Sequence, residues 1–213
     1  MKISFYLIRH GKTAGNLDGR YVGRTDEGLC DRGKHDLENI RDEGLWPRDP
    51  DLLLFSSPMR RCRESARILF PGKPLLLAEG MQECDFGQFE YKNYQEMHSW
   101  PAYQRWIDSG GKSGFPGGES REAFKSRIRS SFEDLIRTVI EEKEADGIKP
   151  GALSAALVCH GGSIMALMDA WGLPRRTYFD WQYPAGGGCL VELDAGDWQR
   201  GRKILRLVRE ERP

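Results

Sequence analysis

The sequence has no excess of either charge, because its 213 residues contain 32 lysines and arginines and 32 aspartates and glutamates. This balance gives no indication of a nucleic-acid partner or an anionic membrane surface, although a local basic cluster can still form a small anion pocket. No apolar run approaches the length of a membrane span, and the first residues lack the pattern of a signal peptide. We therefore expect a cytoplasmic protein with neither a nucleic-acid nor a membrane partner.

The cysteines lack a pattern as well. There are five of them, an odd number, and no two stand in a C-x-x-C arrangement. Such a set predicts reduced thiols and argues against a disulfide framework or a zinc site. No other cluster of metal-ligand residues is evident, so we expect no metal and no cofactor.

Apolar runs alternate with chain breakers along the sequence, which predicts successive β/α units. We predict a single domain over residues 1–213, a three-layer α/β/α sandwich with a mostly parallel central sheet of about six strands and helices on both faces. The expected strands cover residues 2–8, 51–55, 75–78, 153–159, 189–193 and 203–208. The expected helices cover residues 31–42, 57–70, 120–143 and 163–171.

Residues 80–120 differ in character, because they are rich in glycine, aromatic and polar residues. We interpret them as a lid-like insertion beside the sheet and not as a separate domain. Their aromatic side chains are compatible with covering an organic substrate and equally with ordinary core packing; examples are Trp100, Tyr103 and Trp106.

Two similar motifs follow expected strands. Arg9-His10-Gly11 ends the first strand, at the edge where open α/β sheets bind ligands. Arginine supplies a planar fork for phosphate oxygens, a neutral histidine can attack phosphorus, and glycine lets the backbone approach an anion. His160-Gly161-Gly162 repeats this arrangement before a helix whose N–H groups favour anions. The two histidines meet if their strands are neighbours in a parallel sheet.

The segment Ser57-Pro58-Met59-Arg60-Arg61 predicts a helix start, with its serine as N-cap and its proline at the first helical position. Arginines in a first helical turn oppose the helix dipole, and a bound anion would offset that mild cost. A solvated helix face is the other explanation, and we expect it to hold for at least one of Arg60, Arg61 and Arg63.

Residues 81–90 place three carboxylates among aromatic side chains, where a raised pKa would suit a proton donor. The residues alone do not distinguish the three candidates, which are also compatible with ordinary surface acids: Glu83, Asp85 and Glu90.

These segments together resemble the histidine phosphatase superfamily, the phosphoglycerate-mutase-like proteins. The resemblance covers nearly the whole chain and rests on five motifs in order. They are Arg9-His10-Gly11 with Thr13 and Asn16, then Ser-Pro-x-x-Arg, then Glu-x-x-Phe-Gly, then Pro-Gly-Gly-Glu-Ser at residues 116–120, and the late His-Gly-Gly.

The resemblance implies that His10 is the nucleophile that becomes phosphohistidine and that Glu83 is the proton donor. It implies a phosphate pocket that includes Arg61, because the family motif places its arginine three residues after the proline. The other pocket residues that it implies are Arg9, His160, Asn16 and the backbone N–H of Gly161, with Thr13 and Arg24 as further binding residues.

Charge near the implied nucleophile has a physical consequence. Arg9 and Arg61 should lower the pKa of His10, because like charges disfavour the imidazolium. Farther along the N-terminal loop, Arg20 or Arg24 is positioned to reach a carboxylate or second phosphate of a substrate.

A departure from the family pattern lies in the lid-like insertion. Phe89-Glu90-Tyr91 stands where the family often has Trp-Glu-Gly. Because the backbone freedom of that glycine is lost, we expect the lid to follow another path.

The implied function is a metal-independent phosphomonoester hydrolase that acts on a small phosphorylated metabolite. The chain is most similar to the α-ribazole-phosphate and broad-specificity branch. The alternative is a cofactor-dependent phosphoglycerate mutase, whose basic, tyrosine-containing segment is not reproduced by Lys92 and Tyr94. A regulatory or binding protein of the same fold is a second alternative. The substrate and the oligomeric state stay open, and a homodimer is compatible with the sequence.

Overall fold

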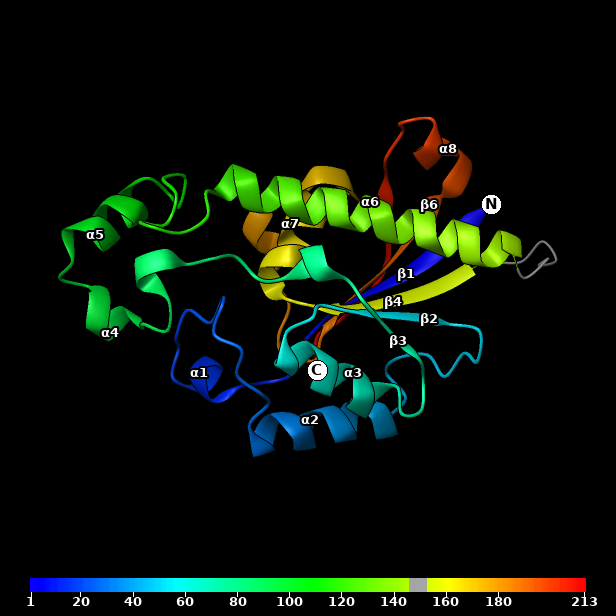
Figure 1. The fold of residues 1–213 in the computed structure, drawn as a ribbon, viewed down its shortest axis with the longest axis horizontal. Coiled ribbons are helices and arrows are strands. Elements are labelled where there is room, and N and C mark those ends of the chain that lie inside the picture. The colour runs from blue at the N-terminus through cyan, green and yellow to red at the C-terminus, as the bar shows by residue number, and fades with distance from the viewer. Residues whose placement is uncertain (146–152) are drawn as a thin grey trace.

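The computed structural model describes residues 1–145 and 153–213, which form one seven-stranded sheet with helices around it (Figure 1). The strand order is β3-β2-β4-β1-β6-β7-β5. The strands are β1 (Lys2–Arg9), β2 (Leu53–Ser56), β3 (Leu75–Leu77), β4 (Leu153–Cys159), β5 (Gly172–Leu173), β6 (Gly188–Asp194) and β7 (Leu205–Glu211). The α-helices are α1 (Ala14–Leu17), α2 (Asp31–Asp42), α3 (Arg60–Leu69), α4 (Tyr94–Met97), α5 (Pro101–Asp108), α6 (Arg121–Ala145), α7 (Gly161–Trp171) and α8 (Ala195–Gln199).

The helices cover both faces of the sheet. Helices α6 and α7 lie on one face and helices α2 and α3 on the other (Figure 1). The apolar side chains of β1 and β4 alternate between these faces, because successive residues of a strand point to opposite sides. Phe5 and Leu7 join the core beneath α6 and α7, whereas Ile8 joins the core beneath α2 and α3. The predicted three-layer α/β/α fold is therefore confirmed.

The predicted sheet is mostly right. Four of the six strand pairings among the described residues are parallel, and β6 runs antiparallel to both of its neighbours. The sheet has seven strands and not about six, because β5 was not expected. Its two residues pair with β7 immediately after α7, where the sequence indicated only the end of a helix.

The prediction for the start of the helix after β2 was wrong. Helix α3 begins at Arg60 with Met59 as N-cap, and no side chain caps it. Ser57 instead directs its hydroxyl to His160, with 2.9 Å between Oγ and Nε2. A tertiary contact therefore takes the serine that the local pattern assigned to the helix.

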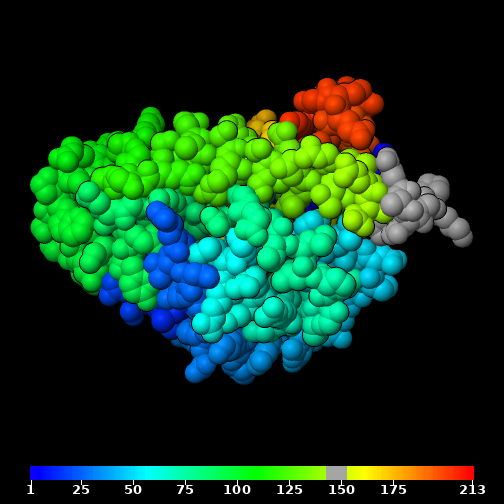
Figure 2. Space-filling view, viewed as in Figure 1, coloured from blue at the N-terminus to red at the C-terminus, as the bar shows by residue number. Residues whose placement is uncertain are grey.

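Residues 80–120 form short helices and loops at one end of the molecule. Figure 2 shows this part in green, with blue residues of the N-terminal loop against it. The segment has a small core of its own, in which the rings of Phe89 and Tyr103 lie 5.4 Å apart. Tyr21 of the N-terminal loop packs against Phe86, with 5.3 Å between ring centroids. Some of these aromatic residues therefore form core, which is one of the two roles that the sequence allowed.

The path of this segment does not depend on a glycine at position 91. Tyr91 has a φ of 58°, in the left-handed region that side chains other than glycine's disfavour. Its hydroxyl donates to Glu27 at 3.1 Å, and the Arg20 guanidinium lies 5.2 Å from the ring centroid. These contacts hold tyrosine in a conformation that glycine would adopt freely.

None of the helices in the described ranges has both the length and the apolar character needed to cross a membrane.

Candidate active site

The sheet brings two histidines together at the ends of neighbouring strands. Strands β1 and β4 are parallel, and Arg9 is paired with Cys159 in their register. The next residue of each strand is a histidine. The rings of His10 and His160 lie 5.2 Å apart between centroids at an interplanar angle of 68°, and both are buried. The expected convergence of the two histidine motifs follows directly from this register.

A backbone contact determines which nitrogen of His10 carries the proton. Nδ1 lies 2.7 Å from the carbonyl oxygen of Gly11, and a carbonyl can only accept. Nδ1 therefore donates, and Nε2 has a free lone pair in the neutral ring. Burial lowers the pKa of His10 well below its ordinary value, and the charges of Arg61 and Arg9 lower it further. The ring is consequently neutral and nucleophilic at Nε2.

Two arginines beside His10 each keep one N–H without an acceptor. One terminal nitrogen of Arg9 donates to the Tyr183 carbonyl at 2.7 Å. The guanidinium of Arg61 donates to the carbonyl oxygens of Thr25 at 2.9 Å and Gly23 at 3.0 Å. In the part of the chain that the structure describes, the Nε atoms of both arginines are buried and have no hydrogen-bond partner. Because unpaired buried donors are costly, these atoms fit an anion as their acceptor.

The second histidine sits at the start of α7. His160 is the N-cap residue of this helix, but its side chain makes no capping hydrogen bond. The His160 side chain therefore does not accept a hydrogen bond from the N–H groups of the first turn, which point toward the site. Gly161, in that turn, lines the cavity. Burial lowers the pKa of His160 well below its usual range, with further lowering by Arg61, His10 and Arg9.

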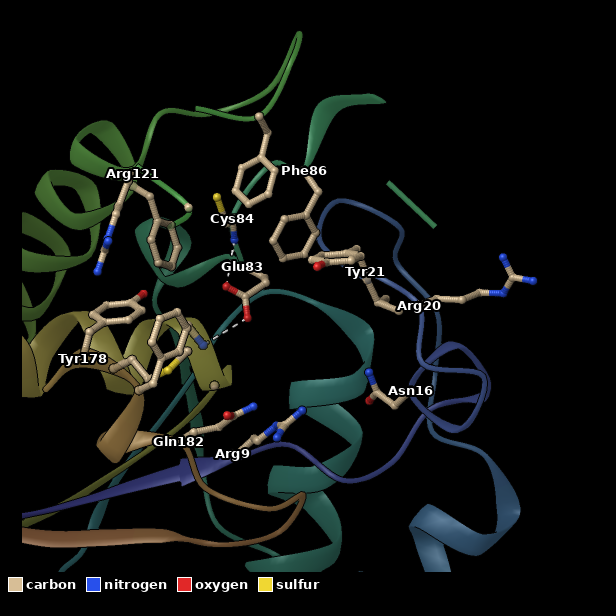
Figure 3. Close-up of a pocket in the computed structure, with 18 of the residues that line it drawn as sticks. Arg9, Asn16, Arg20, Tyr21, Glu83, Cys84, Phe86, Arg121, Tyr178 and Gln182 are labelled. Atoms are coloured by element: carbon tan, nitrogen blue, oxygen red, sulfur yellow. Dashed lines mark hydrogen bonds between the residues drawn. The ribbon is translucent and has the colours of Figure 1, made fainter. Parts of the chain in front are cut away.

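The structure separates the three carboxylates that the sequence left equivalent. Glu83 points into the site and accepts hydrogen bonds from the backbone of Cys84 at 2.9 Å and Gly162 at 3.3 Å (Figure 3). Burial raises its pKa above the ordinary glutamate value, against the opposing effect of these bonds and of the nearby arginines. Asp85 instead pairs with Arg24, and Glu90 accepts from the loop backbone at Gly23 and Thr25.

These groups surround the inner end of a cavity of about 340 Å³. Its inner wall comes from Arg9, His10, Asn16, Glu83, Gly161 and Gly162. Its outer wall is largely aromatic and comes from Tyr21, Phe86, Trp106, Phe115, Phe124, Tyr178 and Phe179, with Arg121 beside them. Gln182 lies next to Arg9 (Figure 3). The arrangement can hold a tetrahedral anion at the bottom and an organic group above it.

The predicted site residues thus fall into three groups. His10, Arg9, Glu83, Asn16 and Gly161 line the cavity, while Arg61 and His160 are fully buried beside it. Thr13 and Arg24 do not line it. The Thr13 hydroxyl caps α1 by accepting from the backbone of Asn16, and Arg24 has a 73% exposed side chain paired with Asp85. A helix cap and a surface ion pair hold these two side chains outside the cavity, and their role in binding stays a prediction.

Arg20 borders the cavity with its stem only. Its guanidinium binds Glu96 and the Tyr91 carbonyl and points away from the site in Figure 3.

Sequence reasoning missed three residues that belong to the site region. Arg121 and Tyr178 line the outer cavity, and Ser57 contacts His160. The sequence did contain one signal, since Arg121 places a cation in the first turn of a long helix, as Arg60 and Arg61 do. Tyr178 gave none, because the short helical turn that carries it has no clear pattern.

Comparisons with known proteins agree with this geometry. The family model described as histidine phosphatase superfamily (branch 1) matches residues 5–204. The chain is 26% identical over 194 residues to adenosylcobalamin/alpha-ribazole phosphatase of Escherichia coli K12, covering 89% of this chain and 88% of that protein. It is 28% identical over 137 residues to phosphoserine phosphatase 1 of Hydrogenobacter thermophilus, covering 62% of this chain and 64% of that one. A crystal structure titled phosphoglycerate mutase, from Thermus thermophilus, matches 99% of both chains with a TM-score of 0.65 and 26% identity.

Proposed function

The chain belongs to branch 1 of the histidine phosphatase superfamily and is a phosphatase, and we propose that it hydrolyses a small phosphomonoester through a phosphohistidine on His10. The observation that carries this proposal is the hydrogen bond from Nδ1 of His10 to the Gly11 carbonyl. It leaves Nε2 unprotonated beside the buried N–H groups of Arg9 and Arg61 that have no other acceptor.

In the first step, Nε2 of His10 attacks phosphorus and the bond from phosphorus to the ester oxygen breaks. The negative charge on the three equatorial phosphate oxygens is bound by Arg9, Arg61, His160, Asn16 and the N–H of Gly161. Glu83, whose raised pKa favours its protonated form, gives its proton to the departing alkoxide. The products of this step are the alcohol and the phosphohistidine.

In the second step, the same carboxylate acts as a base. Glu83 takes a proton from water, the water oxygen attacks phosphorus, and the bond between nitrogen and phosphorus breaks. Inorganic phosphate leaves, Glu83 is protonated again, and Nε2 of His10 is free for the next turnover. His10 keeps its proton on Nδ1 throughout, so in these two steps the proton is given up and taken back by Glu83.

The test is to trap the intermediate. We expect ³²P from a labelled phosphomonoester to appear on His10 after an acid-free quench, and we expect no label on His10→Ala. His98→Ala is the matched control, because His98 is exposed on the outer segment, where its ring contacts the Gln95 carbonyl and the Tyr94 ring. Turnover without label on His10 would refute the proposal, and absence of both label and turnover would favour the regulatory alternative.

A mutase remains the second candidate, because one matched structure carries that name. A mutase moves phosphate between hydroxyls of 3-phosphoglycerate and its bisphosphate, whereas a phosphatase releases it. Measuring inorganic phosphate and 2-phosphoglycerate in one assay distinguishes the two.

The proposal has four further parts: a metal-independent reaction, a lid role for residues 80–120, a cytoplasmic location and a homodimer without nucleic acid. In the described ranges, no three His, Cys, Asp or Glu side chains form a group suited to a metal ion. Activity that survives dialysis against EDTA tests the first part. Sedimentation at several concentrations tests the dimer.

A further inference from the structure

Arg121 is a positively charged residue in the outer wall of the cavity. It is the first residue of α6, it is half-buried, and its guanidinium lies 4.4 Å from the ring centroid of Tyr178. Figure 3 shows both side chains on one side of the cavity, with Glu83 between them and the N-terminal loop. A cation at the start of a 25-residue helix opposes the helix dipole, so its position needs a compensating charge.

Glu122 is the acidic residue of that first turn, yet no carboxylate among the described residues forms an ion pair with Arg121. Lys125 also lies over Tyr178, at 5.0 Å, but it is paired with Asp169 at 2.8 Å. Arg20 is paired with Glu96 at 2.9 Å. Arg121 makes neither an ion pair nor a hydrogen bond to another described residue, and its guanidinium lies over the Tyr178 ring. It is thus the unneutralised charge of the outer cavity.

We propose that Arg121 binds a carboxylate on the leaving group of the substrate, which is therefore a phosphomonoester of an organic acid. This inference rests on the phosphatase function proposed above and adds its substrate class. Stacking on Tyr178 fixes the guanidinium plane, and a fixed fork suits bidentate binding of a carboxylate. One guanidinium neutralises one carboxylate, whereas a second phosphate would bring almost twice the charge.

The position of Arg121 agrees with the direction of the reaction. Glu83 must face the ester oxygen that it protonates, so the leaving group extends from the phosphate past Glu83 into the outer cavity. Phe124 and Tyr178 border that space and can enclose the apolar part of the leaving group. The carboxylate then meets Arg121 at the far end.

Matched substrates of two lengths test the inference. The first pair is 3-phosphoglycerate and glycerol 3-phosphate, and the second is 4-(carboxymethyl)phenyl phosphate and its neutral amide. We expect the wild-type protein to prefer the carboxylated ester of at least one pair by about 10- to 100-fold in kcat/KM, the usual scale of a charge-assisted hydrogen bond. In Arg121→Gln that preference should fall below about threefold, and Arg121→Lys should retain part of it.

Arg137→Gln is the matched control, because it removes an exposed arginine from the same helix, which is paired with Asp134. It should leave the preference unchanged. Hydrolysis of the neutral esters with no preference for a carboxylate, or a preference that survives Arg121→Gln, overturns the carboxylate site but leaves the phosphatase function intact. A stronger preference for 4-(phosphonomethyl)phenyl phosphate over the carboxylate would also overturn it. Failure to hydrolyse any of these esters and to label His10 would overturn both proposals.

Discussion

A β-carbon added to Gly162 would lie 2.4 Å from Oε1 of Glu83, far inside contact distance. The backbone N–H of Gly162 also donates to Oε2 of the same carboxylate, at 3.3 Å. Position 162 therefore leaves space for the proton donor and orients it.

We expect Gly162→Ala to displace Glu83 and lower kcat about 10- to 100-fold, within the range that acid–base catalysis supplies. The loss should be largely absent when Gly162→Ala is added to Glu83→Gln, because both changes act on one group. Steady-state kinetics of the two single variants and the double variant measure this coupling. Additive losses would show that Gly162 acts elsewhere.

Ser57→Ala should impair His160 specifically. The hydroxyl lies 2.9 Å from Nε2 of His160, and its loss leaves a buried ring nitrogen without that partner. We expect kcat to fall about tenfold in Ser57→Ala and to recover in Ser57→Thr. The free energy of unfolding of Ser57→Ala should fall by about 1–2 kcal/mol. Ser56→Ala is the control, because that buried hydroxyl donates to the Ser57 carbonyl. Equal losses in the two variants would assign Ser57 a purely structural role.

The pH dependence of kcat/KM should follow two shifted groups. Glu83 must be protonated, so the rate falls as pH rises through its pKa, which burial places above the ordinary value of 4.5. His10 must be neutral, so the rate falls as pH drops through its pKa, which lies well below 6.5. We therefore expect activity to persist at pH values where a free histidine is protonated. In Glu83→Gln the decline in rate caused by ionisation of Glu83 should disappear, whereas any decline caused by ionisation of the substrate should remain. An unchanged profile would contradict the assignment of Glu83 as proton donor.

Stability should also depend on the buried histidines. The pKa values of His10 and His160 are lower in the folded state than in the unfolded chain, so unfolding takes up protons as pH drops below about 6.5. Each should reduce the free energy of unfolding by about 1.4 kcal/mol per pH unit until its folded-state pKa is reached. Urea unfolding from pH 7.5 to 5 measures this slope. It should be shallower in His160→Gln, which removes one of the two buried rings.

Tyr91 offers a test of backbone strain. Glycine adopts its φ of 58° without penalty, whereas alanine does not. Both Tyr91→Gly and Tyr91→Ala lose the contacts of the tyrosine ring. We expect Tyr91→Gly to be the more stable of the two by about 1 kcal/mol in urea unfolding. If the alanine variant is equally stable, the left-handed conformation is not held by the surrounding chain.

The sequence predicted the elements that have strong patterns. Strands β1 and β4 are long apolar runs that end in Arg-His and Cys-His, and both were placed within one residue of their observed ends. Strand β5 could not be found, because two residues carry no periodicity and the pairing with β7 comes from more than 30 residues away. Ser57 was misassigned for a related reason, since its local signal for a helix cap is outweighed by a contact with His160.

The site was predictable where the family motifs cover it. The residues alone did not separate Arg61 from Arg60, and the structure shows why the distinction matters, since Arg61 is fully buried and Arg60 pairs with Glu64 on the surface. Arg121 lies outside those motifs. Its importance depends on which charges are neutralised by neighbours, and only the fold decides that.

The shared register of β1 and β4 links catalysis to refolding. His10 and His160 each stand one residue beyond the rung that joins Arg9 and Cys159. A slip by one residue would move one imidazole about 3.3 Å along the sheet and turn its strand's side chains to the opposite face. A collapsed intermediate with misaligned strands would therefore be inactive, and enzymatic turnover during renaturation would report when this central alignment is complete.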